Sequence, residues 1–313
     1  MIVSSTLTIG WIGIGKMGLP MAVRAMQAGF DITGFDASSG RLALAKEQGL
    51  KSVASAAAAA QGKDAVVVSL PDDKVLRDAM FGSGGVVAQM ADGAVLIETS
   101  TVSAEISAEL AALAVSRNIS YLRTPVSGNA SIAHTGALTC FVSGPKPAFE
   151  KMRPLLASFT RAQTWLGEAE EARYAKLAVN LMIAVSAGMM AESLALARKG
   201  GIAWQDILNV LDDSAIASPM VKYKTAPLRS RDFESTFSCR QMAKDLDLIL
   251  DAGREASVPL PLAALTRETY GALIAEGEGE TDFIATVRRA ERLSGLGEPG
   301  PDELKSGAIR GKT

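Results

Sequence analysis

Histidine and cysteine are scarce in this chain, and their scarcity excludes much of enzyme chemistry. His134 is the only histidine among 313 residues, so the chain cannot supply a histidine-based metal cluster. His134 is also the only possible member of a Ser-His-Asp or Cys-His arrangement, and we expect it to be structural. Cys140 and Cys239 stand far apart and offer neither a disulfide framework nor a zinc ligand set. We therefore expect buried thiols, a reducing compartment and no metal.

A charge excess of either sign is also missing. The 32 Lys and Arg residues against 34 Asp and Glu residues give a formal net charge of −2. No basic surplus indicates binding to nucleic acid or to anionic lipid. With 48% apolar and 21% charged residues the chain can bury a sizeable core, and its length fits about two domains. This composition excludes disordered and collagen-like proteins.

Long hydrophobic runs are absent as well. The segment Met1–Leu7 has no charged region before its first apolar run, which predicts a strand rather than a secretion signal. The longest apolar stretch, Leu177–Ala191, is interrupted by Asn180 and is shorter than the roughly 18 residues that a membrane-spanning helix needs. We expect a cytoplasmic protein without a membrane partner.

What the first half of the chain does contain is an alternation of short β-branched runs with amphipathic segments. This pattern, from Leu7 to about Gly167, predicts βαβ units around a parallel sheet. The predicted strands are Thr8–Ile14, Asp31–Phe35, Ala65–Leu70, Ala94–Glu98, Ile119–Leu122, Leu138–Ser143 and Gln163–Leu166. The predicted helices are Met17–Ala28, Arg41–Gln48, Asp72–Met80, Ser103–Arg117 and Pro147–Phe159, with Ala56–Ala60 as a short surface helix. Residues 1–167 are thus expected to form an α/β domain.

Strand patterns stop after Gly167, and the second half is predicted to be all-α. Glu168–Arg198 is one long helix rich in Ala, Leu and Met, and a helix that is apolar all round must be buried on several sides. Further helices are predicted at Trp204–Leu211, Cys239–Ala256, Pro261–Glu276 and Thr281–Ser294. We expect the long helix and an all-α domain over residues 168–294 and a loose tail over 295–313.

A glycine-rich turn joins the first predicted strand to the first predicted helix. Gly13-Ile14-Gly15-Lys16-Met17-Gly18 matches G-x-G-x-x-G, and Asp36 ends the next strand 18 residues beyond the last glycine. In such a loop the first glycine makes a tight turn, the second lets backbone N–H groups approach a pyrophosphate, and the third lets the helix pack on the sheet. The context predicts a dinucleotide site, with a structural glycine turn as the alternative. Met17 stands where a phosphate-binding P-loop needs Ser or Thr, so nucleotide hydrolysis is rejected.

These residues belong to a longer set of family motifs. The run from Ile12 to Ala22, Ile-Gly-Ile-Gly-Lys-Met-Gly-Leu-Pro-Met-Ala, resembles the opening signature of the β-hydroxyacid dehydrogenases, the 3-hydroxyisobutyrate dehydrogenase family. Further motifs follow in family order: Leu70-Pro71, Glu98-Thr99-Ser100-Thr101, Pro125-Val126-Ser127-Gly128, Lys176 with Asn180, and Lys244-Asp245-Leu246. The resemblance spans about Gly10 to Leu293 and implies a Rossmann-type parallel sheet domain joined by a long interdomain helix to an all-α domain.

The resemblance implies a nicotinamide cofactor and the residues that bind it. These are Gly13, Ile14, Gly15, Lys16, Met17, Gly18, Asp36, Leu70, Pro71, Thr101 and Lys244. Asp36 stands at the position that hydrogen-bonds the ribose hydroxyls, and its carboxylate would repel a 2′-phosphate. We therefore expect NAD, with NADP as the alternative because Arg41 lies five residues further on.

The same resemblance implies the catalytic and substrate-binding residues. Lys176 is the general acid/base, which takes the hydroxyl proton during oxidation. Asn180 lies at i+4 on the same helix face, so both side chains can hold one substrate. Ser127, Gly128 and Asn129 are expected to bind the substrate carboxylate.

Departures from the family pattern concentrate around these substrate residues. Arg123-Thr124 stands where the family usually has Asp-Ala, and Asn129 stands at its second glycine. Val179 replaces the first of two consecutive asparagines, and Glu98 replaces the usual aspartate. Arg123 and Asn129 lead us to expect a tighter or more polar carboxylate pocket, so the substrate transfers least from the family.

The expected function is hydride transfer between NAD and a small 3-hydroxy acid, such as a 3-hydroxyisobutyrate-like acid with a semialdehyde product. The alternatives are an imine-type or semialdehyde/glyoxylate reductase that uses NADPH, and a non-catalytic dinucleotide-binding module. Retention of Lys176 and Lys244 disfavours the imine-type and non-catalytic alternatives. The expected partners are a small carboxylate-bearing substrate and further copies of the chain in a homodimer or homotetramer.

Overall fold

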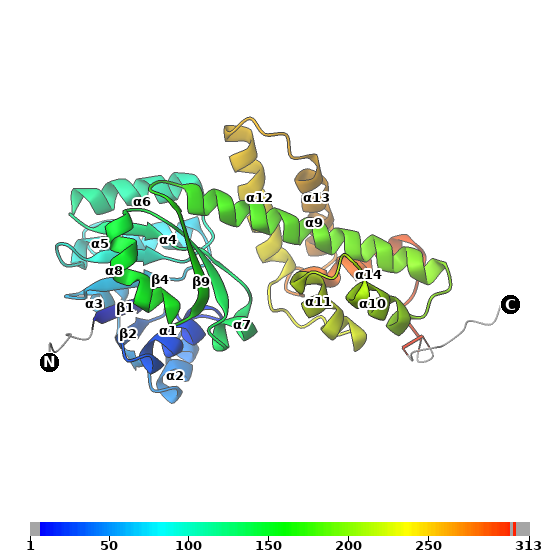
Figure 1. Cartoon of the computed structure of the whole chain (residues 1–313), viewed down its shortest axis with the longest axis horizontal. Helices are drawn as coiled ribbons and strands as arrows, with labels where there is room; N and C mark the ends of the chain where they lie inside the picture. The colour runs from blue at the N-terminus through cyan, green and yellow to red at the C-terminus, as the bar shows by residue number, and fades with distance from the viewer. Residues whose placement is uncertain (1–6, 301–302, 305–313) are drawn as a thin grey trace. The chain divides into compact units, whose positions relative to one another are not determined.

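The chain forms two compact units, Met1–Lys176 and Leu177–Thr313, in a computed structural model (Figure 1). The structure describes residues 7–300 and 303–304. This description leaves out the residues before Leu7 and residues 301–302 and 305–313. Most of the strand expected over Met1–Leu7 and much of the expected loose tail therefore lie outside the described residues. In the described part of that tail, the backbone oxygen of Glu303 accepts a hydrogen bond from the Trp204 N–H at 3.1 Å.

The first unit is built around one mostly parallel sheet. Its strands are β1 (Thr8–Ile12), β2 (Asp31–Phe35), β3 (Lys51–Ser52), β4 (Ala65–Val68), β5 (Val95–Glu98), β6 (Ser120–Arg123), β7 (Val126–Ser127), β8 (Leu138–Ser143) and β9 (Thr160–Gly167). The strand order is β3-β2-β1-β4-β5-β6-β8-β7, with β9 beside β8. Pairing is parallel from β3 to β6, and β8 is antiparallel to both β6 and β7. The order reverses between β1 and β4, where open α/β sheets bind their ligands.

Helices cover both faces of this sheet (Figure 1). They are α1 (Gly18–Gln27), α2 (Ser39–Glu47), α3 (Ala56–Ala60), α4 (Asp73–Met80), α5 (Val86–Gln89), α6 (Ala104–Ser116), α7 (Ala130–His134) and α8 (Lys146–Ala157). Trp11 packs with α1 and α8 on one face, whereas Val66 and Val68 pack with α4, α5 and α6 on the other. Strands buried on both faces are apolar at every position, as in Ala65–Val68, which is why the sequence identified them.

The predicted fold class is confirmed, and the differences lie in short or crowded elements. The helix over Ala56–Ala60 exists, but Ala59 and Ala60 are buried rather than on the surface. A methyl group at Gly10 would come within 2.3 Å of the Ala59 carbonyl oxygen, so this helix packs directly on the first strand. The elements β3, α5, β7 and α7 were not predicted because two to five residues carry too little periodicity.

The second unit is helical within the described residues. Its elements are α9 (Glu171–Lys199), which begins in the first unit, α10 (Trp204–Asp213), α11 (Pro219–Arg229), α12 (Cys239–Glu255), α13 (Pro261–Ala275), a 3₁₀ turn η1 (Phe283–Ala285) and α14 (Thr286–Leu293). The core gathers around Trp204, Leu246, Tyr270 and Phe283. The sequence reading missed α11, which contains Pro227, and it began α14 at Thr281 instead of Thr286.

Helix α9 was expected to be buried on several sides, but one of its apolar sides is exposed. Leu177, Ala184 and Leu194 lie in the core, but Met182, Met189 and Leu196 are 72%, 57% and 76% exposed. Among the described helices, α9 is long and apolar enough to cross a membrane by length and composition. Core helices of globular proteins meet the same criterion, and 39% of its apolar window is buried.

Candidate active site

The glycine-rich turn connects β1 to α1 beside the reversal point of the sheet. Gly13 has φ +86°, and a methyl group there would lie 2.2 Å from the Ser69 carbonyl oxygen. A methyl group at Gly18 would lie 1.9 Å from the Gly13 carbonyl oxygen, whereas one at Gly15 would meet nothing within 4 Å. Gly13 and Gly18 are therefore required by packing, and Gly15 leaves open space beside the backbone. Because no side chain caps the N-terminus of α1, its first N–H groups are suited to an anion.

Asp36 braces this turn from the end of β2. One carboxylate oxygen, Oδ2, accepts a hydrogen bond from the Ile14 N–H at 3.0 Å, and Oδ1 accepts one from the Ser38 N–H at 2.9 Å. Each carboxylate oxygen can accept a further hydrogen bond, for example from a ribose hydroxyl. The open backbone at Gly15, the uncapped helix and this acid together fit a dinucleotide.

The loops after β4 and β5 meet at the same edge of the sheet. The Leu70 N–H donates to Ser100 Oγ at 2.8 Å, and a methyl group at Gly13 would lie 3.1 Å from Leu70 Cδ2. The loop that carries Leu70 and Pro71 is thus brought beside both the glycine-rich turn and the loop that carries Ser100 and Thr101. This places three predicted cofactor-binding segments at one edge, as the sequence indicated.

Ser127 is the last residue of β7, Gly128 follows it, and Asn129 is the N-cap residue of α7. Gly128 has φ +131°, and a methyl group there would lie 2.6 Å from Leu138 Cδ2, so the position requires glycine. The side-chain oxygen of Asn129 accepts from the Ile132 N–H at 3.0 Å and caps α7. The Nδ2 amide is consequently the group that Asn129 can offer to a carboxylate.

Arg123 is not a pocket side chain, in contrast to the interpretation drawn from the sequence. It is buried, pairs with Glu170 and donates through Nε to Ser107 Oγ at 3.0 Å. Its guanidinium carbon also lies 4.7 Å from the centre of the Tyr121 ring. The hydrogen-bonding capacity of Arg123 therefore serves the interior of the first unit.

Lys176 and Asn180 lie one turn apart on α9. In the second unit Asn180 is buried, and its Nδ2 donates to Asp245 Oδ2 at 2.6 Å. Lys244 Nζ lies 2.9 Å from the other oxygen of the same buried carboxylate. Since an ionised carboxylate only accepts, the amide nitrogen of Asn180 must face Asp245, and its Oδ1 is directed elsewhere as an acceptor. No local sequence pattern indicates the Asn180–Asp245 hydrogen bond, because 65 residues separate the partners.

Titratable side chains outside these groups offer little chemistry. Cys140 and Cys239 are both buried, as predicted, and burial raises the pKa of Cys239 to about 11. Among residues 7–300 and 303–304, no cluster of three His, Cys, Asp or Glu side chains is arranged to hold a metal ion. Sequence reasoning overlooked Arg173, a buried cation three residues before Lys176. Arg173 stands in a charged segment, close to Glu170 and Glu171, so the sequence pattern does not distinguish it from a surface residue.

The chain is a dinucleotide-binding protein of the Rossmann class, because its strand order is β3-β2-β1-β4-β5-β6, with a glycine-rich turn at the reversal point and an acid after β2. Residues 8–167 match the family model of the NAD-binding domain of 6-phosphogluconate dehydrogenase. Residues 171–290 match that of the NAD-binding domain of NADP-dependent 3-hydroxyisobutyrate dehydrogenase. The chain belongs to the β-hydroxyacid dehydrogenase family, and it is an NAD(P)-dependent oxidoreductase that acts on a CH–OH group.

Full-length relatives support this assignment. The chain is 29% identical over 296 residues to 2-(hydroxymethyl)glutarate dehydrogenase from Eubacterium barkeri. The matched region covers 94% of this chain and 98% of that protein. The crystal structure of 3-hydroxyisobutyrate dehydrogenase from Salmonella typhimurium superposes with a TM-score of 0.84 at 27% identity, over 90% of this chain and 99% of that one. The structure of Mycobacterium tuberculosis 3-hydroxyisobutyrate dehydrogenase with L-serine superposes with a TM-score of 0.81 at 29% identity, over 91% of this chain and 99% of that one.

Proposed function

We propose that this protein is a cytoplasmic NAD-dependent dehydrogenase of small 3-hydroxy acids, with Lys176 as its general acid/base. The observation that carries the proposal is the pair formed by Lys176 and Asn180 on one face of α9. Asp245 orients the amide of Asn180, which leaves its carbonyl oxygen as an acceptor one turn from the lysine amine. A lysine one helical turn from a fixed acceptor is suited to hold a hydroxyl group and to move its proton.

The proton and the hydride leave the substrate by different routes. When bound, the nicotinamide supplies the acceptor for a hydride from the carbon that bears the hydroxyl. The neutral amine of Lys176 takes the hydroxyl proton as the carbonyl forms, and in the reverse direction the ammonium returns it. Asn180 Oδ1 accepts a hydrogen bond from the hydroxyl or from the lysine and so fixes the direction of transfer.

The carboxylate end of the substrate needs donors at a fixed place. Ser127 supplies a hydroxyl, Gly128 a backbone N–H, and Asn129 its Nδ2 amide, because its oxygen is occupied by the cap of α7. Three donors from consecutive residues favour a small acid with a carboxylate at this end. The preference for 3-hydroxy acids over 2-hydroxy acids is supported by the relatives, since 2-(hydroxymethyl)glutarate and 3-hydroxyisobutyrate, after which they are named, are both 3-hydroxy acids.

A panel of hydroxy acids tests the proposal directly. Purified protein is assayed by the absorbance of reduced nicotinamide with 3-hydroxyisobutyrate, 3-hydroxypropionate and L-serine, each with NAD and with NADP. The matched 2-hydroxy acids, lactate and glycolate, are the controls. We expect turnover of at least one 3-hydroxy acid with NAD at ten or more times the rate of any 2-hydroxy acid. Activity only on 2-hydroxy acids or on imines, or cofactor binding without turnover of any of them, would contradict the proposal.

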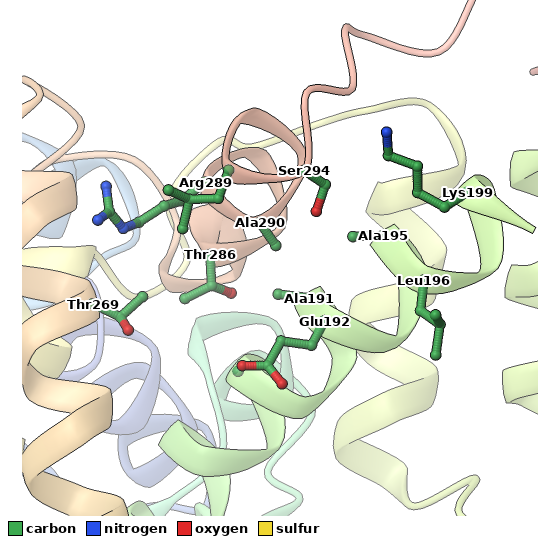
Figure 2. A pocket seen from close by; sticks show the side chains of 12 residues that line it. Ala191, Glu192, Ala195, Leu196, Lys199, Thr269, Thr286, Arg289, Ala290 and Ser294 are labelled. Atoms are coloured by element: carbon green, nitrogen blue, oxygen red, sulfur yellow. The ribbon is translucent and has the colours of Figure 1, made fainter.

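We further propose that the active form is a homodimer or homotetramer assembled through α9. Met182, Met189 and Leu196 repeat every seven residues on the exposed side of this helix, the spacing of a helix-pairing seam. Next to the seam, a pocket bounded by α9, α13 and α14 is lined by small residues, including Ala191 and Ala195 (Figure 2). Small residues let another helix approach closely. Both charge signs occur at the pocket, so opposite charges of two copies can pair across a self-complementary interface.

Light scattering after gel filtration tests the assembly. Met189→Glu places a charge in the seam, whereas Val115→Glu on α6 changes a comparably exposed apolar residue, 76% exposed, in the first unit. We expect Met189→Glu to give a smaller particle and Val115→Glu to keep the size of the wild type. A monomeric wild type would refute the proposed assembly.

A further inference from the structure

A buried ion pair joins the start of α9 to the end of β5. Arg173, in the first turn of α9, and Glu98, the last residue of β5, are both buried and pair through Nη2 and Oε2. The other oxygen of Glu98 accepts from the Ser100 N–H, and Arg173 Nη1 donates to the Ser100 carbonyl oxygen at 2.8 Å. Both backbone polar groups of Ser100 are thus held between the two charged side chains.

A second set of contacts fixes the guanidinium group in its plane. Arg173 Nη2 also donates to the Tyr121 hydroxyl at 2.9 Å, and Nε donates to Ser107 Oγ at 3.3 Å. Burial lowers the pKa of Arg173 to about 9, so the guanidinium stays charged at neutral pH. Burial raises the pKa of Tyr121, so its hydroxyl stays protonated. Arg173 is consequently held in one orientation by side chains from β5, β6 and α6.

Such a pair contributes less to stability than to geometry. Desolvation of two charges offsets most of their attraction, and well-packed apolar side chains of similar volume are often equally stabilising. The guanidinium, however, forms directional bonds to a carboxylate, a carbonyl and a hydroxyl together, which an apolar side chain cannot do. The arrangement therefore specifies where the first turn of α9 lies relative to the loop after β5.

Both segments joined by the pair carry residues of the candidate active site. Thr101 follows Ser100 directly, and Ser100 Oγ also receives the Leu70 N–H. Lys176 follows Arg173 by three residues, which is nearly one helical turn and about 4.5 Å along the axis. A tilt of this first turn would therefore move the lysine amine relative to Thr101. All these residues lie in the first unit.

We propose that Arg173 is a positioning residue, which through Glu98 and Ser100 fixes Lys176 relative to the nicotinamide side of the cofactor site. The inference rests on the proposed function for the role of Lys176, and on the NAD(P) site for the role of Thr101. A displacement of about 1 Å between reacting groups can cost roughly 10²-fold in rate, so a loosened pair should lower kcat. The adenosine side, held by the glycine-rich turn and Asp36, should not be affected.

The test replaces both charges together, because a single replacement would leave a buried charge unpaired and could prevent folding. In Glu98→Gln/Arg173→Met, the glutamine oxygen can still accept from the Ser100 N–H, and methionine fills the space of the arginine stem. The matched control is Glu291→Gln/Arg198→Met, which removes another buried Arg–Glu contact, 2.7 Å long, at the far end of the same helix. Arg231, the other partner of Glu291, keeps its ion pair with Glu298, and Glu303, the other partner of Arg198, is 19% exposed and can be solvated.

Two readouts separate positioning from a merely structural role. The first is kcat with the best hydroxy acid, measured below the unfolding temperature of each variant. The second is affinity for NADH and for ADP-ribose, which lacks the nicotinamide, by titration calorimetry. We expect Glu98→Gln/Arg173→Met to lose at least tenfold in kcat and threefold in NADH affinity, with ADP-ribose affinity unchanged. The control should keep all three values within about twofold, whatever its melting temperature.

The outcomes also separate this inference from the proposed function. If the wild type turns over no hydroxy acid but the variant loses affinity for NADH and not for ADP-ribose, the positioning role stands and the proposed function fails. If the wild type is active and the variant keeps kcat and both affinities, the positioning role is refuted and the function stands. Equal losses of NADH and ADP-ribose affinity, or equal losses in the control, would also refute it.

Discussion

Gly15→Ala should separate cofactor binding from folding at the glycine-rich turn. A methyl group at Gly15 meets no protein atom within 4 Å, so the folded chain can accept it. Loss of a glycine from the unfolded chain stabilises by about 0.4–1 kcal/mol where the backbone is compatible. The same methyl group occupies the space through which a pyrophosphate reaches the backbone N–H groups. Loss of one hydrogen bond to a charged group costs about 1.5–3 kcal/mol, which is roughly 10- to 150-fold in NADH affinity.

Gly18→Ala is the matched comparison, because its methyl group would meet backbone. The new carbon would lie 1.9 Å from the Gly13 carbonyl oxygen, and the turn would have to shift by more than 1 Å to relieve the overlap. Overpacking of this kind costs about 1–3 kcal/mol, so both the melting temperature and the NADH affinity should fall.

Thermal unfolding and calorimetric titration with NADH check both variants. We expect Gly15→Ala to melt within about 3 °C of the wild type, since surface changes usually stay within about 0.5 kcal/mol, and to bind NADH at least tenfold more weakly. If Gly15→Ala binds NADH within twofold of the wild type, or is destabilised as much as Gly18→Ala, the assigned role of the open backbone at Gly15 is wrong.

Three further predictions concern cofactor choice, substrate choice and alkaline stability. The wild type should show a higher kcat/KM with NAD than with NADP. Asp36→Asn should raise kcat/KM with NADP at least tenfold relative to kcat/KM with NAD, because it removes the repulsion of the 2′-phosphate. A preference of the wild type for NADP would contradict this prediction. Asn129→Gly should change the preference among hydroxy acids and leave NADH affinity unchanged. It should lower the free energy of unfolding by only a few tenths of a kcal/mol, because glycine is tolerated at a helix N-cap. An unchanged substrate profile would place Asn129 outside the pocket. Burial raises the pKa of Cys140 and Cys239, so the folded thiols stay protonated after unfolded thiols ionise. The free energy of unfolding, from urea titrations, should therefore fall above about pH 9 by roughly 1.4 kcal/mol per pH unit for each thiol, and Cys140→Ala should reduce this slope. Above about pH 10 three tyrosines whose pKa is raised by desolvation add to the fall, namely the buried Tyr121 and Tyr270 and the half-buried Tyr223. A flat profile from pH 8 to 11 would refute the argument.

The sequence predicted the parts of the fold that repeat a pattern over many residues. Ala65–Val68 is apolar at every position, and the helix over Trp204–Asp213 alternates at helical spacing, so both were identified. Helix α11 was missed because Pro219 and Pro227 look like breaks, although Pro219 occupies the first turn, where its missing N–H costs nothing.

The candidate site shows a similar division between local and tertiary information. The glycine-rich turn and Asp36 are recognisable because their spacing is local, and the roles of Lys176 and Asn180 came from family resemblance. Contacts made across the fold had no local signal. Arg123 could not be assigned to Glu170, nor Asn180 to Asp245, until the elements were packed.

The central claim, that Lys176 moves the proton, is tested most directly by Lys176→Ala in the presence of the best hydroxy acid. Lys222→Ala, at an exposed position of α11, is the matched control. General acid/base groups contribute about 10²- to 10⁴-fold in rate, so kcat of Lys176→Ala should fall by that factor while NADH affinity and the control stay at the wild-type values. A Lys176→Ala enzyme that binds NADH normally and turns over within about threefold of the wild type would show that another group moves the proton.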